Sequence, residues 1–119
     1  MNQEEKEVVK EVYEAIDKLK DLPVIVEGKK DKKALEAIGF KKVITLNKAL
    51  YKVCEEISDK KVMILTDLDK EGKQIYGRLK KDLNKRGVLV DDKLRNLLFR
   101  TSLRQIEGLT HYLDKLDEL

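Results

Sequence analysis

The stretch "PVIVEGKKD", Pro23–Asp31, sets the interpretation of this chain, because its short apolar run ends abruptly in an acid and a glycine. A second stretch, "KVMILTDLDKEG", Lys61–Gly72, repeats the arrangement with two aspartates after the apolar run. Short β-branched runs bounded by polar residues and glycine are typical of buried strands. In both stretches a helical pattern follows the glycine. The two stretches therefore predict β-strands that end in carboxylates and lead into helices.

Strand and helix patterns alternate along the rest of the chain as well. "KKVITL" predicts a strand between the two quoted stretches, and "VLV" after Gly87 indicates a fourth. Asp31 and Asn47 are placed to cap the two helices between the first three strands. Apolar strands that alternate with helices favour a parallel sheet covered on both faces. We therefore predict an α/β, Rossmann-like fold with a mainly parallel sheet of about four strands, flanked by helices and preceded by an N-terminal helix.

Length and composition narrow the class of protein. A chain of 119 residues is expected to form one domain over 1–119, with a helix at about 3–20, a core at about 23–90 and a helical segment at about 91–119. One cysteine and one histidine argue against a disulfide, a cysteine-built zinc site and a histidine-rich metal centre. No apolar run approaches a membrane span, and the charged start of the chain favours a cytoplasmic protein.

The acids at the strand ends suggest a site for a cation. Carboxyl ends of parallel strands share one edge of the sheet, so Glu27, Asp67 and Asp69 are expected to lie near one another. Carboxylates held close together raise each other's pKa unless a cation neutralises them, and hard oxygen ligands suit Mg²⁺. The competing explanation is that these acids are turn residues and helix caps, which are common directly after strands.

The two stretches together resemble the signatures of the Toprim domain. "VIVEGKKD" is similar to the first signature, and "MILTDLDKEG" is similar to the second, with a strand and a helix between them. The resemblance covers about Pro23 to Val90 and is strongest to small stand-alone Toprim proteins. Related domains occur in primases, topoisomerases and a ribosomal-RNA-maturing ribonuclease.

The resemblance implies a role for each residue of the two motifs. Asp67 and Asp69 would bind Mg²⁺, with Mn²⁺ as an alternative ion, and Glu27 would act as general acid and base or share the metal. Asp31 would cap the first helix of the motif and orient Glu27. Two glycines would let the backbone approach the site closely, namely Gly28 and Gly72. Glu107 is a further candidate acid, although a surface helix explains it equally well.

Basic residues near the acids are candidates for binding a phosphate backbone. The net charge of +3 is too small to indicate a nucleic-acid partner by itself, so the positions of the bases matter more. The candidates follow the first acid or lie on the helix after the second motif: Lys29, Lys30, Lys73, Lys80 and Lys81. For any single lysine, an ordinary solvated helix face remains the competing explanation.

These observations predict a Mg²⁺-dependent protein that acts on RNA or DNA phosphodiesters, most simply a nuclease, with protein partners or a homodimer left open. One alternative is a non-catalytic, metal-assisted nucleic-acid-binding module of an RNA-processing or repair assembly. A phospho-receiver domain, another parallel α/β fold with acids at its strand ends, ranks below both. It needs an earlier acidic pair and a later lysine at a strand end, and neither is evident here.

Overall fold

The computed structural model describes residues 3–117, so the expected domain limits at residues 1 and 119 lie outside the described residues. The chain begins with α1 (Gln3–Leu19), whose buried face carries Val8, Val12 and Ile16 at helical spacing. Pro23 then precedes the fully buried strand β1 (Val24–Val26). No helix within the described range is long and apolar enough to cross a membrane.

A parallel sheet of four strands forms the centre of the fold. Its spatial order is β2 (Val43–Thr45), β1, β3 (Lys61–Ile64) and β4 (Leu89–Val90). Every adjacent pair is parallel. The connections run through α2 (Lys29–Ala37), α3 (Leu50–Glu55) and α4 (Lys70–Lys85). The predicted α/β class and mainly parallel sheet are confirmed.

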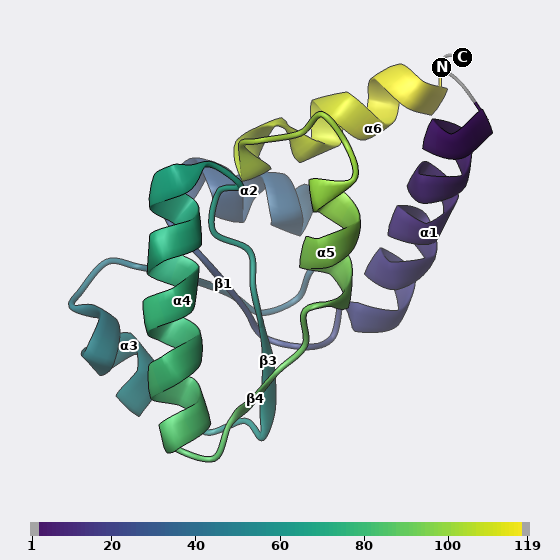
Figure 1. Cartoon of the computed structure of the whole chain (residues 1–119). Helices are drawn as coiled ribbons and strands as arrows, with labels where there is room; N and C mark the ends of the chain where they lie inside the picture. The colour runs from purple at the N-terminus through teal and green to yellow at the C-terminus, as the bar shows by residue number, and fades with distance from the viewer. Residues whose placement is uncertain (1–2, 118–119) are drawn as a thin grey trace.

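Helices cover both faces of this sheet (Figure 1). Val24 and Val26 of β1 pack with α1, α2 and the two later helices α5 (Lys93–Phe99) and α6 (Leu109–Asp117). Ile25, between them in β1, packs on the opposite side with α3 and α4. Successive residues of a strand point to opposite faces, so an uninterrupted apolar run serves two cores at once. This explains why the strands show no alternation of apolar and polar residues.

Helix ends differ from the prediction in three places. Helix α3 begins after Ala49, whose side chain makes no capping hydrogen bond, so the predicted Asn47 cap is wrong. Gly28 is the N-cap of α2, and Asp31 contributes to the cap from the third helical position. The helical segment expected at about 91–119 is interrupted after α5, where a loop and a 3₁₀ turn, η1 (Ile106–Gly108), precede α6.

Candidate active site at the ends of β1 and β3

Glu27 links the carboxyl ends of two neighbouring strands. It directly follows β1, and its Oε2 accepts a 2.7 Å hydrogen bond from the backbone N–H of Asp67, just beyond β3. The strands are adjacent in the sheet, with Ile25 opposite Ile64, so residues 40 positions apart in sequence meet here. The first acid of one motif therefore contacts the backbone of the first acid of the other.

Asp69 and Gly72 shape the turn from β3 into α4. Asp69 is the N-cap of α4, and its Oδ1 accepts a 2.8 Å hydrogen bond from the Gly72 N–H. A Cβ at position 72 would lie 1.9 Å from the carbonyl oxygen of Asp67, so any side chain there would displace the backbone. The buried Thr66 hydroxyl donates a 2.7 Å hydrogen bond to the Gly72 carbonyl and holds the turn closed. The glycine is thus required by close packing of the two backbone segments.

Asp31 is the last residue of the first motif, and its side chain contacts the turn after Glu27. Its Oδ2 accepts a 3.1 Å hydrogen bond from the Gly28 N–H, and its side chain is buried. Gly28 itself has extended backbone, and a Cβ there would meet only Asp31 Oδ2, at 4.0 Å. Asp31 therefore stabilises the turn after Glu27 through this hydrogen bond. Gly28 has open space around it, so close packing does not require a glycine there.

The segment before α6 covers one side of the site. The Ile106 N–H donates a 2.9 Å hydrogen bond to Asp67 Oδ1, and the Leu68 N–H donates a 2.8 Å bond to the Arg104 carbonyl. Glu107 follows, exposed to solvent. The charge of Glu107 raises the pKa of the Asp31 carboxyl, and the Glu107 backbone N–H lowers it. The turn η1 therefore lies close to the first motif. The sequence analysis did not predict this contact, because it joins segments that lie 39 residues apart in the chain.

Arg95 of α5 is a buried cation beside the site that was not among the predicted residues. Its side chain is only 2% exposed. One guanidinium nitrogen donates a 2.7 Å hydrogen bond to the Thr66 carbonyl, and another donates a 3.3 Å bond to the Asp67 carbonyl. The guanidinium also lies over the rings of Tyr76, at 4.5 Å, and Phe99, at 5.3 Å. A positive charge thus supports the backbone that carries the two aspartates.

The carboxyls at this edge perturb one another. Burial raises the pKa of Glu27, and the charges of Asp67, Asp69 and Asp31 raise it further, while the hydrogen bond from the Asp67 N–H opposes the shift. Burial likewise raises the pKa of Asp31, against the hydrogen bond from Gly28. A carboxylate surrounded by like charges and partly removed from water holds its proton more tightly. The carboxylates therefore repel one another, and a bound cation would reduce this repulsion.

Comparison with known proteins agrees with this geometry. A model of the Toprim domain matches residues 23–100. The chain belongs to the Toprim domain family. The family resemblance carried by the two motifs is therefore confirmed, and the phospho-receiver alternative is set aside.

Several relatives of this Toprim chain match over nearly its whole length. The UPF0292 protein MJ1624 of Methanocaldococcus jannaschii is 31% identical, over 92% of this chain and 94% of the relative. A UPF0292 protein of Archaeoglobus fulgidus is 32% identical, over 90% of this chain and 93% of its own. A solved structure of a protein from Aquifex aeolicus is 37% identical, with a TM-score of 0.71, and covers 87% of this chain and 95% of that chain. The chain is thus similar to small proteins of about its own size.

Toprim domains generally bind a divalent metal, and the acids of this chain suit such an ion chemically. Within residues 3–117, Glu27, Asp67 and Asp69 each use one carboxylate oxygen for a backbone hydrogen bond and leave the other without a protein partner. Carboxylate oxygens are the type of ligand that a hard cation prefers. Even so, no group of three His, Cys, Asp or Glu side chains in the described part of the chain is arranged to hold an ion.

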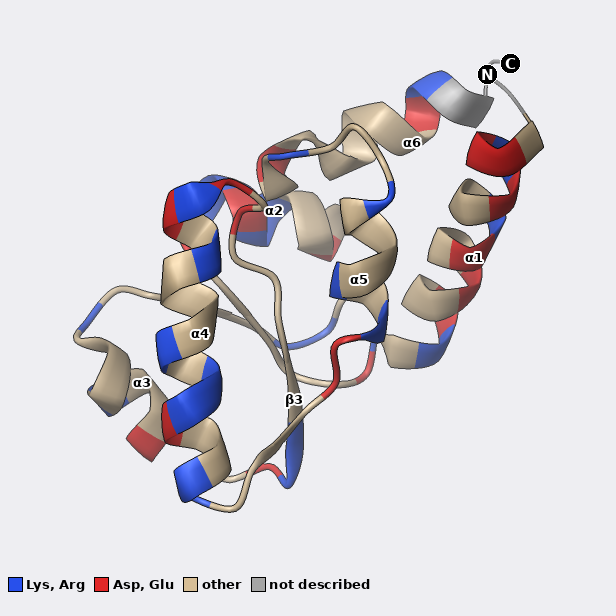
Figure 2. Cartoon of the chain, in the orientation of Figure 1, with Lys and Arg blue, Asp and Glu red and all other residues tan. Residues whose placement is uncertain are grey.

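The predicted basic residues of this Toprim chain differ in their exposure to solvent and in their interaction partners. Lys29 and Lys30 are exposed in the first turn of α2, and Lys81 is exposed on α4. Lys73 lies 5.3 Å above the Phe99 ring. Lys80 forms a 2.6 Å ion pair with Asp92, which raises the pKa of the ammonium. Basic stretches run along α4, whereas α1 carries many acidic ones (Figure 2).

Proposed function

We propose that this Toprim protein is a magnesium-dependent enzyme that acts on nucleic-acid phosphodiesters, most simply as a nuclease. The observation that carries the proposal is the contact between Glu27 and the Asp67 backbone, at 2.7 Å, among the charges of Asp31, Asp67 and Asp69. It places a carboxyl with a raised pKa beside two further carboxylates. A carboxyl whose pKa is raised, beside other carboxylates, is suited to proton transfer and to cation binding.

In this proposal Asp67 and Asp69 hold Mg²⁺, or Mn²⁺ in its place, through the oxygens that their backbone hydrogen bonds leave unpaired. A bound divalent ion offsets charge on the phosphate and orients its oxygens. Glu27 accepts a proton from the attacking water or returns one to the leaving oxygen, or else shares the metal. Arg95 acts through the backbone, because its guanidinium fixes the Thr66 and Asp67 carbonyls.

The substrate class follows from charge. A phosphate backbone must approach an edge that carries several carboxylates, so neighbouring cations are needed to attract it. Lys29, Lys30, Lys73 and Lys81 are exposed around this edge and along α4. RNA or DNA is therefore the proposed partner, and a second copy of the chain or another protein remains a further candidate.

The test is magnesium-dependent cleavage of three labelled substrates: structured RNA, single-stranded DNA and duplex DNA. We expect at least one to be cut, with no cutting in EDTA or by Asp67→Asn. Glu27→Gln should retain substrate binding but cut more slowly by about 10²–10⁴-fold, the usual contribution of general acid–base catalysis. Cleavage by Glu27→Gln at the parental rate would remove Glu27 from the mechanism.

One observation favours a second function, that of a non-catalytic, metal-assisted nucleic-acid-binding module. All three acids have structural hydrogen bonds, and no three acids of the described residues are arranged to hold an ion. The same acids would then mainly organise the turns, and the lysines would dock the nucleic acid. In that case neither the parent nor Glu27→Gln will cut any substrate, and both will bind it with similar affinity.

A further inference from the structure

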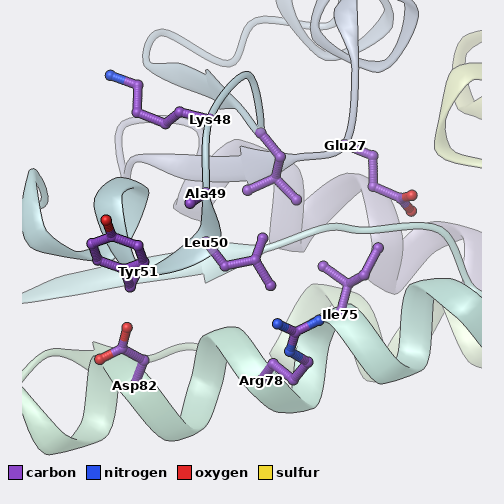
Figure 3. A pocket seen from close by; sticks show the side chains of 9 residues that line it. Glu27, Lys48, Ala49, Leu50, Tyr51, Ile75, Arg78 and Asp82 are labelled. Carbon is purple, nitrogen blue, oxygen red and sulfur yellow. The ribbon is translucent and has the colours of Figure 1, made fainter.

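A cavity opens beside Glu27 on the side of the sheet covered by α3 and α4. Its volume is about 610 Å³, and its lining runs from Glu27 and the segment after β2 to the facing sides of the two helices. Ligand pockets in proteins usually measure about 300–1,000 Å³. The cavity shares Glu27 with the candidate active site, so a ligand inside it would lie directly next to the proposed reaction centre (Figure 3).

The walls of this cavity combine aliphatic side chains with one exposed aromatic ring. Leu46, Leu50 and Ile75 line it and are partly buried. Tyr51 lines it as well and is 57% exposed, although the chain has few aromatic residues. An exposed tyrosine ring next to aliphatic walls offers a planar apolar surface on which a nucleobase can stack. The walls thus suit a flat, partly apolar group.

Among the described residues that line the cavity, one cation has no carboxylate partner. Lys48 is paired with Glu56 at 2.9 Å, and Figure 3 shows it pointing away from the cavity. Asp82 is paired with Arg86, also at 2.9 Å.

Arg78 differs from these paired groups. It reaches from α4 toward Leu50 and Ile75 in Figure 3, and no carboxylate of the described residues pairs with it. An unpaired guanidinium can bind a phosphate through two parallel hydrogen bonds.

We propose that this cavity binds one nucleotide unit, with its base against Tyr51 and the aliphatic wall and its phosphate on Arg78. The bound nucleotide would place the adjoining phosphodiester at Glu27, and this consequence rests on the proposed function. A base inside a duplex is paired and stacked, so it cannot enter a cavity between two helices. The substrate class is therefore nucleic acid with an unpaired nucleotide, either a single strand or a frayed end.

The test measures binding of mononucleotides in EDTA, so that neither metal nor cleavage contributes. The probes are the four nucleoside 5′-monophosphates and, for comparison, ribose 5-phosphate. The readout is the shift of backbone amide NMR signals from 46–51 and 75–82 during titration. At least one nucleotide should bind with shifts confined to these segments, and more tightly than ribose 5-phosphate. Since stacking contributes about 1–3 kcal/mol per base, Tyr51→Ala should weaken binding about 5- to 150-fold.

Arg78→Gln should weaken the binding of the nucleotides and of ribose 5-phosphate alike, because it removes the phosphate contact. Lys85→Gln is the matched control, since Lys85 is an exposed cation of the same helix that does not line the cavity. The proposal is overturned if no nucleotide binds, if ribose 5-phosphate binds equally well, or if Tyr51→Ala binds like the parent. Mononucleotide binding without cleavage of any nucleic acid would support the cavity and reject the nuclease. Cleavage without mononucleotide binding would do the reverse.

Discussion

The buried guanidinium of Arg95 donates a 2.7 Å hydrogen bond to the main-chain carbonyl of Thr66, one residue before the first aspartate of the site. A second bond, of 3.3 Å, reaches the Asp67 carbonyl itself. Burial lowers the pKa of Arg95, whereas the nearby charges of Asp92, Glu27 and Asp67 raise it. The fold thus places a buried cation behind the acidic edge and fixes the backbone that carries the acids.

Arg95→Met should destabilise the protein, because it leaves two backbone carbonyls without their donors. Hydrogen bonds that involve a charged group contribute about 1.5–3 kcal/mol each, so we expect the loss of both bonds to lower the free energy of unfolding by about 3–6 kcal/mol. Urea unfolding measures this change. Arg100→Met is the control, since the exposed 3.4 Å pair of Arg100 with Glu11 should contribute about 1 kcal/mol or less. Equal effects of the two substitutions would contradict the role of Arg95.

Two glycines of α4 offer a matched comparison. Gly72→Ala would put a Cβ 1.9 Å from the Asp67 carbonyl oxygen, whereas at Gly77 nothing lies within 4 Å. Gly72→Ala should therefore lower the melting temperature and displace the aspartates. Gly77→Ala should raise stability by about 0.5–1 kcal/mol, because alanine is the better helix former. A Gly72→Ala variant as stable as the parent would show that the turn adapts freely.

Asp67→Asn combined with Asp69→Asn should abolish Mg²⁺ binding in titration calorimetry. The fold should survive, because an asparagine side-chain oxygen can still accept the hydrogen bonds from the Ile106 and Gly72 N–H groups. Loss of two negative charges also relieves repulsion on Glu27, so the melting temperature without metal should stay the same or rise. Asp17→Asn on α1 is the control for removing an exposed acid. Unchanged Mg²⁺ affinity in the double variant would reject the metal assignment.

The stability conferred by Glu27→Gln should depend on pH. The pKa of Glu27 is raised above its ordinary value of 4.5 in the folded protein, so the folded state binds this proton more tightly than the unfolded chain does. Stability is therefore lost as the pH rises from 4.5 through the pKa of the folded state, because the ionised carboxylate destabilises the fold. Glu27→Gln should melt at a higher temperature than the parent at neutral pH.

That advantage should shrink as the pH falls below 4.5, where both states of the parent carry the proton. Melting curves of parent and variant over a pH series measure the difference. A gap that stays constant with pH, or widens toward acid pH, would contradict the raised pKa.

The lysines of α4 should contribute unequally to nucleic-acid binding. Lys73→Glu with Lys81→Glu should weaken binding of all sequences alike and flatten the salt dependence by about one unit of slope per lost phosphate contact. Lys80→Gln should change binding less, because Lys80 is already paired with Asp92. Filter binding across a salt series compares the variants. Equal binding by the double variant and the parent at low salt would exclude this face.

Lys80→Gln should instead affect stability. It leaves the Asp92 carboxylate without its cation, and the other oxygen of Asp92 is already buried without a partner among the described residues. We expect a loss of about 1 kcal/mol or less, because the ion pair is partly exposed to solvent. Urea unfolding measures it, and a stability equal to the parent's would show that the pair contributes nothing.

The sequence by itself determined the elements and the acids at their ends. Apolar runs such as Val24–Val26 specify a buried strand through residue type and length, and helical spacing marks the buried face of α1. The two motifs indicated the family, because their residues and spacing are local properties of the chain. The glycine of the second motif could also be recognised, although the backbone against which it packs, the Asp67 carbonyl, could not.

Only the tertiary structure decided how these parts meet. The hydrogen bond between Glu27 and the Asp67 N–H depends on β1 lying next to β3, which local periodicity does not encode. Arg95 looks like any cation of a surface helix in the sequence, since burial results from packing between distant elements. Tyr51 and Arg78 line one cavity only because α3 and α4 pack on the same face of the sheet. Side-chain chemistry is local, but the distances between side chains are set by the whole fold.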